Sequence, residues 1–297
     1  MKIYIDGKYY SKEEAKVSVF DHGLLYGDGV FEGIRAYNGR VFKLDEHLER
    51  LFESMRGIFI EPRWSLEKLR SLVVETVRLN GLKDAYIRLV VTRGYGDLGL
   101  DLRKCKVPSL IIIADHISLY PESTYQTGVT LVASHLRRVS HQSLTPNIKS
   151  LNYLNNILAK DGAVRAGAGE AVMLNMEGYV TECTGDNIFF LKGGVWYTPP
   201  AWAGLLDGVT RRVAIELIGK ELKMPVKEEL FTLFHLYQAE EIFLTGTAAE
   251  ILPAVKIDGR VIGTGKPGPR TQQLVGHFRD LTRKTGVPVY ETAGSAK

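Results

Sequence analysis

The segment PNIKSLNYLNNILAK, residues 146–160, places a lysine where a helix is expected to begin, because leucines recur behind it at helical spacing. The first turn of a helix carries partial positive charge, which makes an ammonium there easier to deprotonate. A lysine must lose its proton before it can act as a nucleophile. Tyr153, four residues after Lys149, would share a face of this helix with it. By spacing alone, a surface lysine and a packing tyrosine remain the more common explanation.

Three further segments carry groups that suit a phosphate-bearing cofactor. Glu182 ends a strand in the apolar stretch GYVTECTGDNIFF, and a half-buried carboxylate requires a cationic partner. Residues 206–210, LDGVT, open a helix whose free N–H groups form an anion site. In LTGTAAE, residues 244–250, a strand breaks into small residues that let a ligand approach the backbone. With Lys149, these are the parts expected of a pyridoxal phosphate site: a Schiff-base lysine, a partner for the pyridine nitrogen and a phosphate cup.

Two glycine-rich motifs match nucleotide-binding turns only in part. GYGDLG, residues 94–99, spells GxGxxG after a strand, but no helical pattern opens at its third glycine, so we interpret it as a glycine loop. GTGKPG, residues 263–268, lacks the first glycine of a P-loop and has a proline after its lysine. There is no HExxH and no Cys/His cluster with metal-ligand spacing, and we therefore expect no metal site.

The composition is that of an ordinary globular enzyme. The chain has 297 residues, 45% hydrophobic and 24% charged, with a formal net charge of +4. The basic residues form no run, which argues against nucleic acid as a partner. The longest apolar run, LIIIA at 110–114, is too short to cross a membrane, and the N-terminus does not resemble a signal peptide. Cys105 and Cys183 form no CxxC pair, and we expect a cytoplasmic protein.

Residues 1–117 are expected to form a small α+β domain. Hairpins at 3–10 and 34–42 turn at Asp-Gly and Asn-Gly, respectively. A helix capped by Asp45 follows, and a second helix runs from its cap Ser65 to Asn80-Gly81. Strands at 85–94 and 109–115 complete a pattern typical of an α+β sandwich.

The second half is expected to form a larger domain, residues 129–297, behind an interdomain loop at 118–128 that shows no clear periodicity. Short strands separated by turns dominate it. Helices are expected after the lysine, at 208–222 and near 270–285.

Seven segments, in order along the chain, resemble the branched-chain amino acid aminotransferases. They are YGDGVFEGIRAY, EHLERL, AYIR, KSLNYL, GYVTECTGDNIF, LLDGVTR and FLTGTAAEI. These enzymes belong to the fold-type IV class of pyridoxal-phosphate enzymes. The resemblance implies a two-domain α+β fold, with a small α/β sandwich domain and a larger β-barrel-like domain flanked by helices.

The resemblance also implies roles around pyridoxal 5′-phosphate. Lys149 would hold the cofactor covalently and then move a proton, while Tyr153 would donate a hydrogen bond to the phenolic oxygen. Glu182 would pair with the pyridine nitrogen. The phosphate would be bound by Arg50 and by the two turns, that is, by Gly208, Val209, Thr210, Gly246 and Thr247. Without the family, Arg50 would be interpreted as part of a solvated helix face.

Substrate recognition can be partly derived from the strand AYIR. Tyr86 and Arg88 are two residues apart, so their side chains point to one face and suit a carboxylate. In the family this element lines the substrate site, where the arginine can meet the distal carboxylate of an acidic substrate. The resemblance adds further residues for the apolar pocket and the α-carboxylate site: Tyr26, Phe31, Gly33, Thr247 and Ala248. Members are at least dimeric, which implies that Tyr26 serves the neighbouring subunit.

The implied reaction moves the amino group of L-leucine, L-isoleucine or L-valine to 2-oxoglutarate, giving branched 2-oxo acids and L-glutamate. Such an enzyme can serve the biosynthesis or the breakdown of branched-chain amino acids. D-amino acid and (R)-amine transaminases share the scaffold and remain the alternative. D-amino acid enzymes also carry VTRG and KSLN, but they typically lack the tyrosine after KSLN and the segment GIRAY, both present here.

Overall fold

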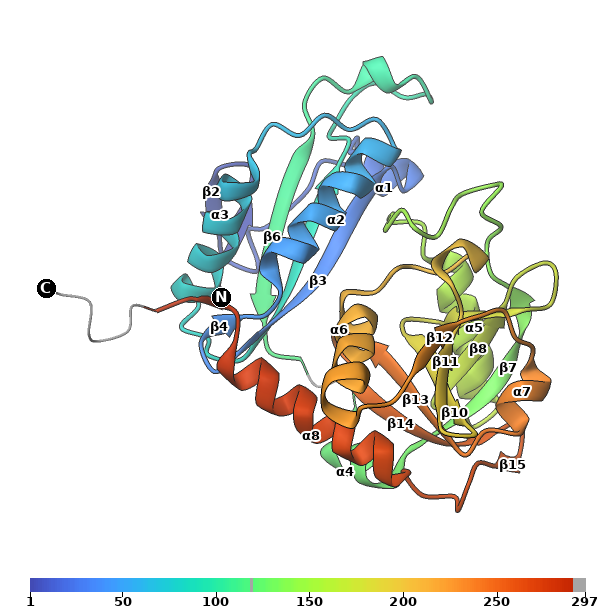
Figure 1. Cartoon of the computed structure of the whole chain (residues 1–297). Helices are drawn as coiled ribbons and strands as arrows, with labels where there is room; N and C mark the ends of the chain where they lie inside the picture. The colour runs from blue at the N-terminus through green and yellow to red at the C-terminus, as the bar shows by residue number, and fades with distance from the viewer. Residues whose placement is uncertain (118–119, 291–297) are drawn as a thin grey trace, which may run out of the picture. The chain divides into compact units, whose positions relative to one another are not determined.

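The computed structural model describes residues 1–117 and 120–290; the first two residues of the expected interdomain loop, 118–119, and the tail 291–297 lie outside the described residues. The chain forms two compact units (Figure 1). Of the described residues, the first contains 1–117, 148–152 and 282–290, and the second contains 120–147 and 153–281. Residues 148–152 therefore group with the first unit, although the sequence suggested that they belong to the larger domain.

The first unit is built on an antiparallel sheet, in which seven strands of the described chain follow the order β16-β4-β3-β5-β6-β1-β2. The strands are β1 Ile3–Ile5, β2 Lys8–Tyr10, β3 Gly29–Tyr37, β4 Arg40–Val41, β5 Ala85–Thr92, β6 Ser109–Asp115 and β16 Val287–Pro288. Both predicted hairpin turns are confirmed, with Asn38 and Gly39 at positive φ between β3 and β4.

Two helices, α2 (Leu44–Gly57) and α3 (Leu66–Leu79), pack against one face of this sheet (Figure 1). Their apolar stripes bury leucines and valines in one core with the inward side chains of β3, β5 and β6. Ser65 caps α3 as predicted, since its side chain accepts a hydrogen bond from the Lys68 N–H. The prediction for Asp45 is wrong: the N-cap of α2 is Lys43, two residues earlier, in a left-handed conformation. Two short helices complete the unit, α1 (His22–Tyr26) and the 3-10 turn η1 (Leu102–Lys104).

The second unit is built on a mixed sheet with the strand order β12-β11-β10-β13-β14-β7-β8-β9, and β15 pairs with β14. The strands are β7 Val129–Arg137, β8 Glu170–Leu174, β9 Val180–Cys183, β10 Asn187–Lys192, β11 Val195–Thr198, β12 Val226–Glu228, β13 Glu241–Gly246, β14 Glu250–Ile257 and β15 Arg260–Val261. Phenylalanines from β10 and β13 stack at the centre, with ring centroids of Phe189 and Phe243 4.7 Å apart.

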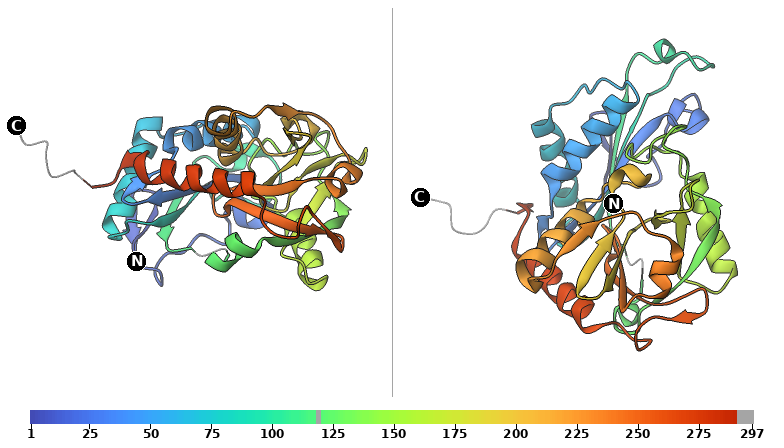
Figure 2. Two further views of the ribbon diagram at one scale, coloured as in Figure 1. Left: turned by 60° about the horizontal axis from the view of Figure 1, so that its bottom comes forward. Right: turned by 45° about the vertical axis from the view of Figure 1, so that its right-hand side comes forward.

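Helices border this second sheet. They are α4 Glu122–Thr127, α5 Leu154–Arg165, η2 Ala201–Ala203, α6 Val209–Leu217 with the π-helical extension η3 Ile218–Leu222, α7 Leu233–Tyr237 and α8 Pro269–Lys284. Figure 2 shows α8 side-on as one continuous helix. Helix α4 falls in the segment expected to be an irregular loop, because its six residues are too few to show a helical period. In the described part of the chain, no helix has the length and apolarity that a membrane crossing requires.

Candidate active site

Lys149 lies on an extended segment at the edge of β3 and not at the start of a helix, so this prediction is wrong. The Phe31 N–H donates to the Lys149 carbonyl at 3.0 Å, and the Leu151 N–H donates to the Gly29 carbonyl at 2.9 Å. The Lys149 N–H donates to the buried Ser54 hydroxyl on α2 at 3.1 Å. Strand pairing thus uses the backbone groups that a helix would need, and α5 begins only at Leu154.

Tyr153 is the N-cap residue of α5 and does not share a helix face with Lys149, which corrects a second prediction. The leucine spacing suggested one helix over both residues, but the helix begins only after them. Instead of a helix dipole, an aromatic ring meets the amine: Lys149 Nζ lies 4.4 Å from the centre of the Phe31 ring.

The sheet face around Phe31 carries the predicted substrate residues of the first unit. In the register of β3 and β5, Phe31 is opposite Val90 and Gly33 is opposite Arg88. Tyr86 and Arg88 share this face, as their spacing predicted, and Ile87 between them is buried on the other face. The Arg88 guanidinium lies 4.4 Å from the centre of the Phe31 ring, so one apolar ring meets both Arg88 and Lys149.

Tyr26 lies at the end of α1 and is tied to the loop 94–101. Its hydroxyl accepts a hydrogen bond from the Gly99 N–H at 3.0 Å. The His22 ring on the same helix contacts the Asp97 carbonyl at 3.1 Å. No helix opens at Gly99. A Cβ at Gly94 would overlap the Val107 carbonyl and one at Gly96 the Lys104 carbonyl, so these two glycines permit a close approach of two backbones. The segment is thus a glycine loop, as we interpreted it from the sequence.

Arg50 is buried on the inner side of α2, with 6% of its surface exposed, and does not lie on a solvated face. Its Nε and Nη2 donate to Oε1 and Oε2 of Glu32 on β3, each at 2.8 Å. His47, one helical turn earlier, contacts the same Oε2 through Nδ1 at 2.8 Å. Neither Glu32 nor His47 was predicted. The signal in the sequence was an acidic residue at a core-facing position of the apolar strand GVFEGIRAY.

The electrostatics of this cluster follow from its burial. Burial alone would raise the pKa of the Glu32 carboxyl, but the Arg50 guanidinium and His47 hold that pKa well below its ordinary value. Burial lowers the pKa of His47, against the opposing effect of the Glu32 charge. His47 is therefore neutral near pH 7, and its Nδ1 carries the proton that it donates to Glu32.

In the second unit, Glu182 on β9 has the cationic partner that its burial required. Arg138 Nε donates to Glu182 Oε1 at 2.8 Å, and both side chains are buried. The other oxygen, Oε2, accepts from the Leu206 N–H at 3.1 Å and from Asn187 Nδ2 at 3.3 Å. Arg138 was not predicted, because nothing local to Glu182 in the sequence indicates a residue 44 positions earlier.

The two predicted phosphate turns are also formed as expected. Gly208 is the N-cap of α6, and Val209 and Thr210 begin that helix and are buried. A Cβ at Gly208 would overlap the Asn187 side-chain oxygen. Strand β13 ends at Gly246, where a Cβ would overlap the Asp186 carboxylate, and Thr247 and Ala248 lie in the turn before β14. A side chain at either glycine would thus displace a buried polar side chain.

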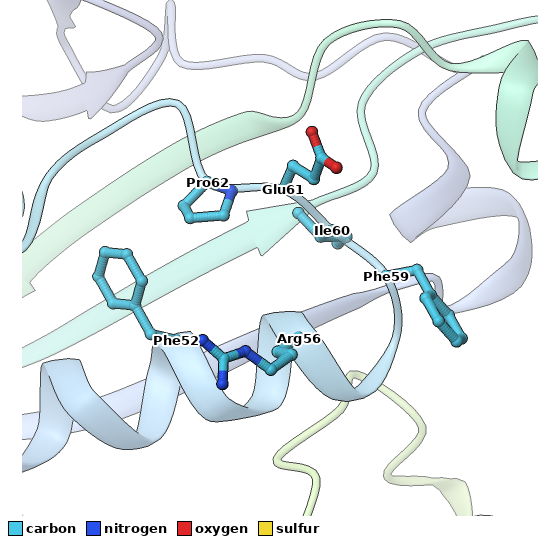
Figure 3. A pocket seen from close by; sticks show the side chains of 6 residues that line it. All are labelled: Phe52, Arg56, Phe59, Ile60, Glu61 and Pro62. Atoms are coloured by element: carbon cyan, nitrogen blue, oxygen red, sulfur yellow. The ribbon is translucent and has the colours of Figure 1, made fainter.

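A cavity of about 290 Å³ lies elsewhere in the first unit. Phe52 and Arg56 on α2 and the following residues 59–62 line it (Figure 3). None of the predicted site residues belongs to its lining. Among the described residues, no group of three or more His, Cys, Asp or Glu side chains could hold a metal ion.

Comparison with known proteins assigns the family. The sequence pattern of the family described as amino-transferase class IV matches residues 29–257. The chain belongs to the class IV aminotransferases. It is 51% identical to the putative branched-chain-amino-acid aminotransferase of Methanocaldococcus jannaschii, covering 98% of this chain and 100% of that protein. It is 37% identical to the D-alanine aminotransferase of Staphylococcus haemolyticus, covering 92% and 95% of the two chains.

Solved class IV structures have the same fold. The branched-chain aminotransferase of Thermoproteus uzoniensis, solved with norvaline, superposes with a TM-score of 0.90 at 40% identity, covering 98% of this chain and 99% of that one. The predicted fold is confirmed: an α+β aminotransferase of fold-type IV, with a small α/β sandwich and a larger unit whose sheet curls like part of a barrel. Enzymes of this class depend on pyridoxal 5′-phosphate, and another branched-chain aminotransferase of this fold was solved with pyridoxamine 5′-phosphate.

The residues of this class IV chain fit that cofactor. The donor set contains a lysine amine, a buried carboxylate at Glu182 and the N-terminus of α6 behind Gly208. The Leu206 N–H and Arg138 both bond to the Glu182 carboxylate, which suits an ionised carboxylate able to pair with a protonated ring nitrogen.

Proposed function

We propose that the chain is a pyridoxal-phosphate-dependent branched-chain-amino-acid aminotransferase. It would move the amino group of L-leucine, L-isoleucine or L-valine to 2-oxoglutarate, with L-glutamate as the second product. The observation that carries this proposal is the contact of one Phe31 ring with both Lys149 and Arg88. An apolar surface with a guanidinium beside the reactive amine suits a site that must accept both a branched aliphatic side chain and a carboxylate.

In this proposal the cofactor supplies an electron sink for the bond between Cα and its hydrogen. Lys149 holds the cofactor through Nζ and carries the proton that leaves Cα. Glu182 keeps the pyridine nitrogen protonated, and Tyr153 donates a hydrogen bond to the phenolic oxygen. Arg50 binds the phosphate, together with the backbone at Gly208, Val209 and Thr210 and at Gly246 and Thr247.

The two substrates would be distinguished on the Phe31 face. The side chain of leucine would lie against Phe31, with Gly33 leaving room for the Tyr86 ring. The distal carboxylate of 2-oxoglutarate would pair with Arg88, whose planar guanidinium suits a bidentate carboxylate. Thr247 and Ala248 would bind the α-carboxylate through their turn.

We propose further that the enzyme is a homo-oligomer, at least a dimer. Helix α1 and the loop tied to it expose large apolar side chains, namely Leu24, Leu25, Tyr26, Tyr95, Leu98 and Leu100. Such a cluster is typical of a surface covered by another chain. Tyr26 would then serve the site of the neighbouring subunit. We place the enzyme in the cytoplasm, in keeping with its two free cysteines.

Borohydride reduction tests the role of Lys149. The wild-type protein, incubated with pyridoxal 5′-phosphate and reduced, should gain the mass of one covalently bound cofactor at Lys149. Lys149→Ala should gain none, whereas Lys106→Ala, at an exposed lysine, should behave like the wild type. A reducible adduct on Lys149→Ala would show that another amine is the nucleophile.

A substrate panel tests the specificity. L-leucine, L-isoleucine, L-valine, D-alanine and (R)-1-phenylethylamine would each be paired with a suitable amino acceptor. The similarity to a D-alanine aminotransferase makes a D-amino acid transaminase the second candidate. Turnover of D-alanine without turnover of L-leucine would replace the first proposal by the second.

A further inference from the structure

The ion pair between Glu32 and Arg50 joins the two elements that hold Lys149. Glu32 is on β3, whose neighbouring residue Phe31 binds the Lys149 carbonyl. Arg50 is on α2, whose Ser54 accepts the hydrogen bond of the Lys149 N–H. The pair therefore lies in the same framework that positions the reactive amine.

Stability alone is a poor explanation for this pair. Glu32 is fully buried, with 0% of its surface exposed, and its neighbours on the same face of β3 are Val30 and Ile34. Removing two charges from water is costly, and apolar residues of similar volume often stabilise such a position as well or better. A valine or leucine at position 32 would continue the apolar face, so the carboxylate requires another reason.

The geometry of the pair fixes the orientation of the guanidinium. Glu32 binds two nitrogens of Arg50, Nε and Nη2, so the plane of the guanidinium is set by the plane of the carboxylate. His47 donates to the same Oε2 and prevents the carboxylate from turning. An unrestrained arginine would lose much of its rotamer entropy on binding an anion. Holding it in advance reduces that loss.

We propose that Glu32, braced by His47, is a positioning residue that aims the Arg50 guanidinium at the cofactor phosphate. The inference rests on the proposed role of Arg50 in phosphate binding and extends it. Glu32 itself would touch neither cofactor nor substrate. Its effect should therefore appear only where a phosphate is bound.

The test compares two ligands that differ by the phosphate. The apoenzyme is titrated with pyridoxal 5′-phosphate and with pyridoxal, and binding is followed by absorbance and by quenching of protein fluorescence. In Glu32→Gln, the Kd for pyridoxal 5′-phosphate should rise about tenfold or more, the usual cost of losing a partner that orients a ligand-binding group. The Kd for pyridoxal should stay unchanged, because the aldehyde, the ring and Lys149 are not affected.

Four further variants complete the test. Glu49→Gln makes the same change at an exposed position of α2 and should bind both ligands like the wild type. His47→Asn keeps a donor near the position of Nδ1 and should retain most of the affinity. If Glu32→Gln does not fold, Arg50→Met is compared with Arg50→Met/Glu32→Gln, because neither variant leaves an unpaired buried cation. If Glu32 acts only through Arg50, these two variants should bind pyridoxal 5′-phosphate equally.

The outcomes separate this inference from the proposed function. Equal losses for both ligands in Glu32→Gln, or no loss for either, would overturn the positioning role. If Arg50→Met loses the preference for the phosphorylated ligand while Glu32→Gln keeps it, the proposed function stands and the inference fails. If the wild type binds both ligands equally, the phosphate role of Arg50 fails, and the inference fails with it.

Discussion

Replacement of Gly33 by alanine should reduce activity far more than stability. Gly33 has no positive φ, so its backbone does not require glycine. The restriction comes from the space around Gly33: a Cβ there would overlap the Tyr86 hydroxyl and stand 3.0 Å from Tyr86 Cζ. Non-bonded heavy atoms pack about 3.5–4.0 Å apart, so the Tyr86 hydroxyl must retreat by roughly an ångström.

The size of each effect follows from which atom must move. The hydroxyl is the far end of a half-buried side chain that can turn outward, and we expect the free energy of unfolding to fall by about 1 kcal/mol, the low end for overpacking. A group displaced by about 1 Å at a substrate site can lower the rate about 100-fold. We therefore expect kcat/KM for L-leucine to fall by about 10- to 100-fold, which is about 1.4–2.7 kcal/mol of transition-state stabilisation.

Steady-state kinetics and urea unfolding, measured on the same preparations, test this reasoning. Gly276→Ala is the matched control, because Gly276 lies in α8 with nothing near its missing Cβ, and alanine there should be neutral or slightly stabilising. Tyr86→Phe removes the overlapping atom, so the double variant Gly33→Ala/Tyr86→Phe should be less destabilised than the sum of the single variants. Full activity of Gly33→Ala, or strict additivity in the cycle, would refute the role of space at this glycine.

Two further predictions concern the same unit. Arg88→Ala should lower kcat/KM for 2-oxoglutarate by about tenfold or more and for L-leucine much less, because only the keto acid brings a distal carboxylate; equal losses would argue against this role. The pKa of His47 in the folded protein lies below its ordinary value of 6.5. The stability that the neutral ring contributes is therefore fully present above pH 6.5, and it is lost as the pH falls toward the lowered pKa. The free energy of unfolding should therefore drop more between about pH 7.5 and pH 5.5 in the wild type than in His47→Asn, and parallel curves from urea unfolding would contradict the assignment.

The parts of the site that follow from local rules could be predicted from the sequence. Tyr86 and Arg88 share a face because strand side chains alternate, and this alternation needs no knowledge of the partner strand. Ser65 caps α3, and Gly208 precedes α6, for equally local reasons. These predictions depend on a few neighbouring residues, and the rest of the fold did not change them.

The surroundings of Lys149 could not be predicted in the same way. Its leucine spacing suggested a helix, but pairing with Gly29 and Phe31 on β3 determined the backbone. A sheet edge more than 100 residues away in the chain leaves no trace in the local pattern. The family resemblance singled out the same lysine, whereas the physical argument first given for it, a helix dipole, was wrong.

Two of the charged residues assigned to the cofactor, Arg50 and Glu182, have a buried charged partner from another part of the chain. Glu32 holds Arg50, and Arg138 holds Glu182. A buried charge without its partner is costly, so neither member of a pair can be exchanged alone at low cost. Variants at Glu32 or Arg138 should therefore impair the enzyme although neither residue is assigned contact with cofactor or substrate. The ligand-binding residues and the residues that orient them form one constrained set, and a search limited to local motifs identifies only half of it.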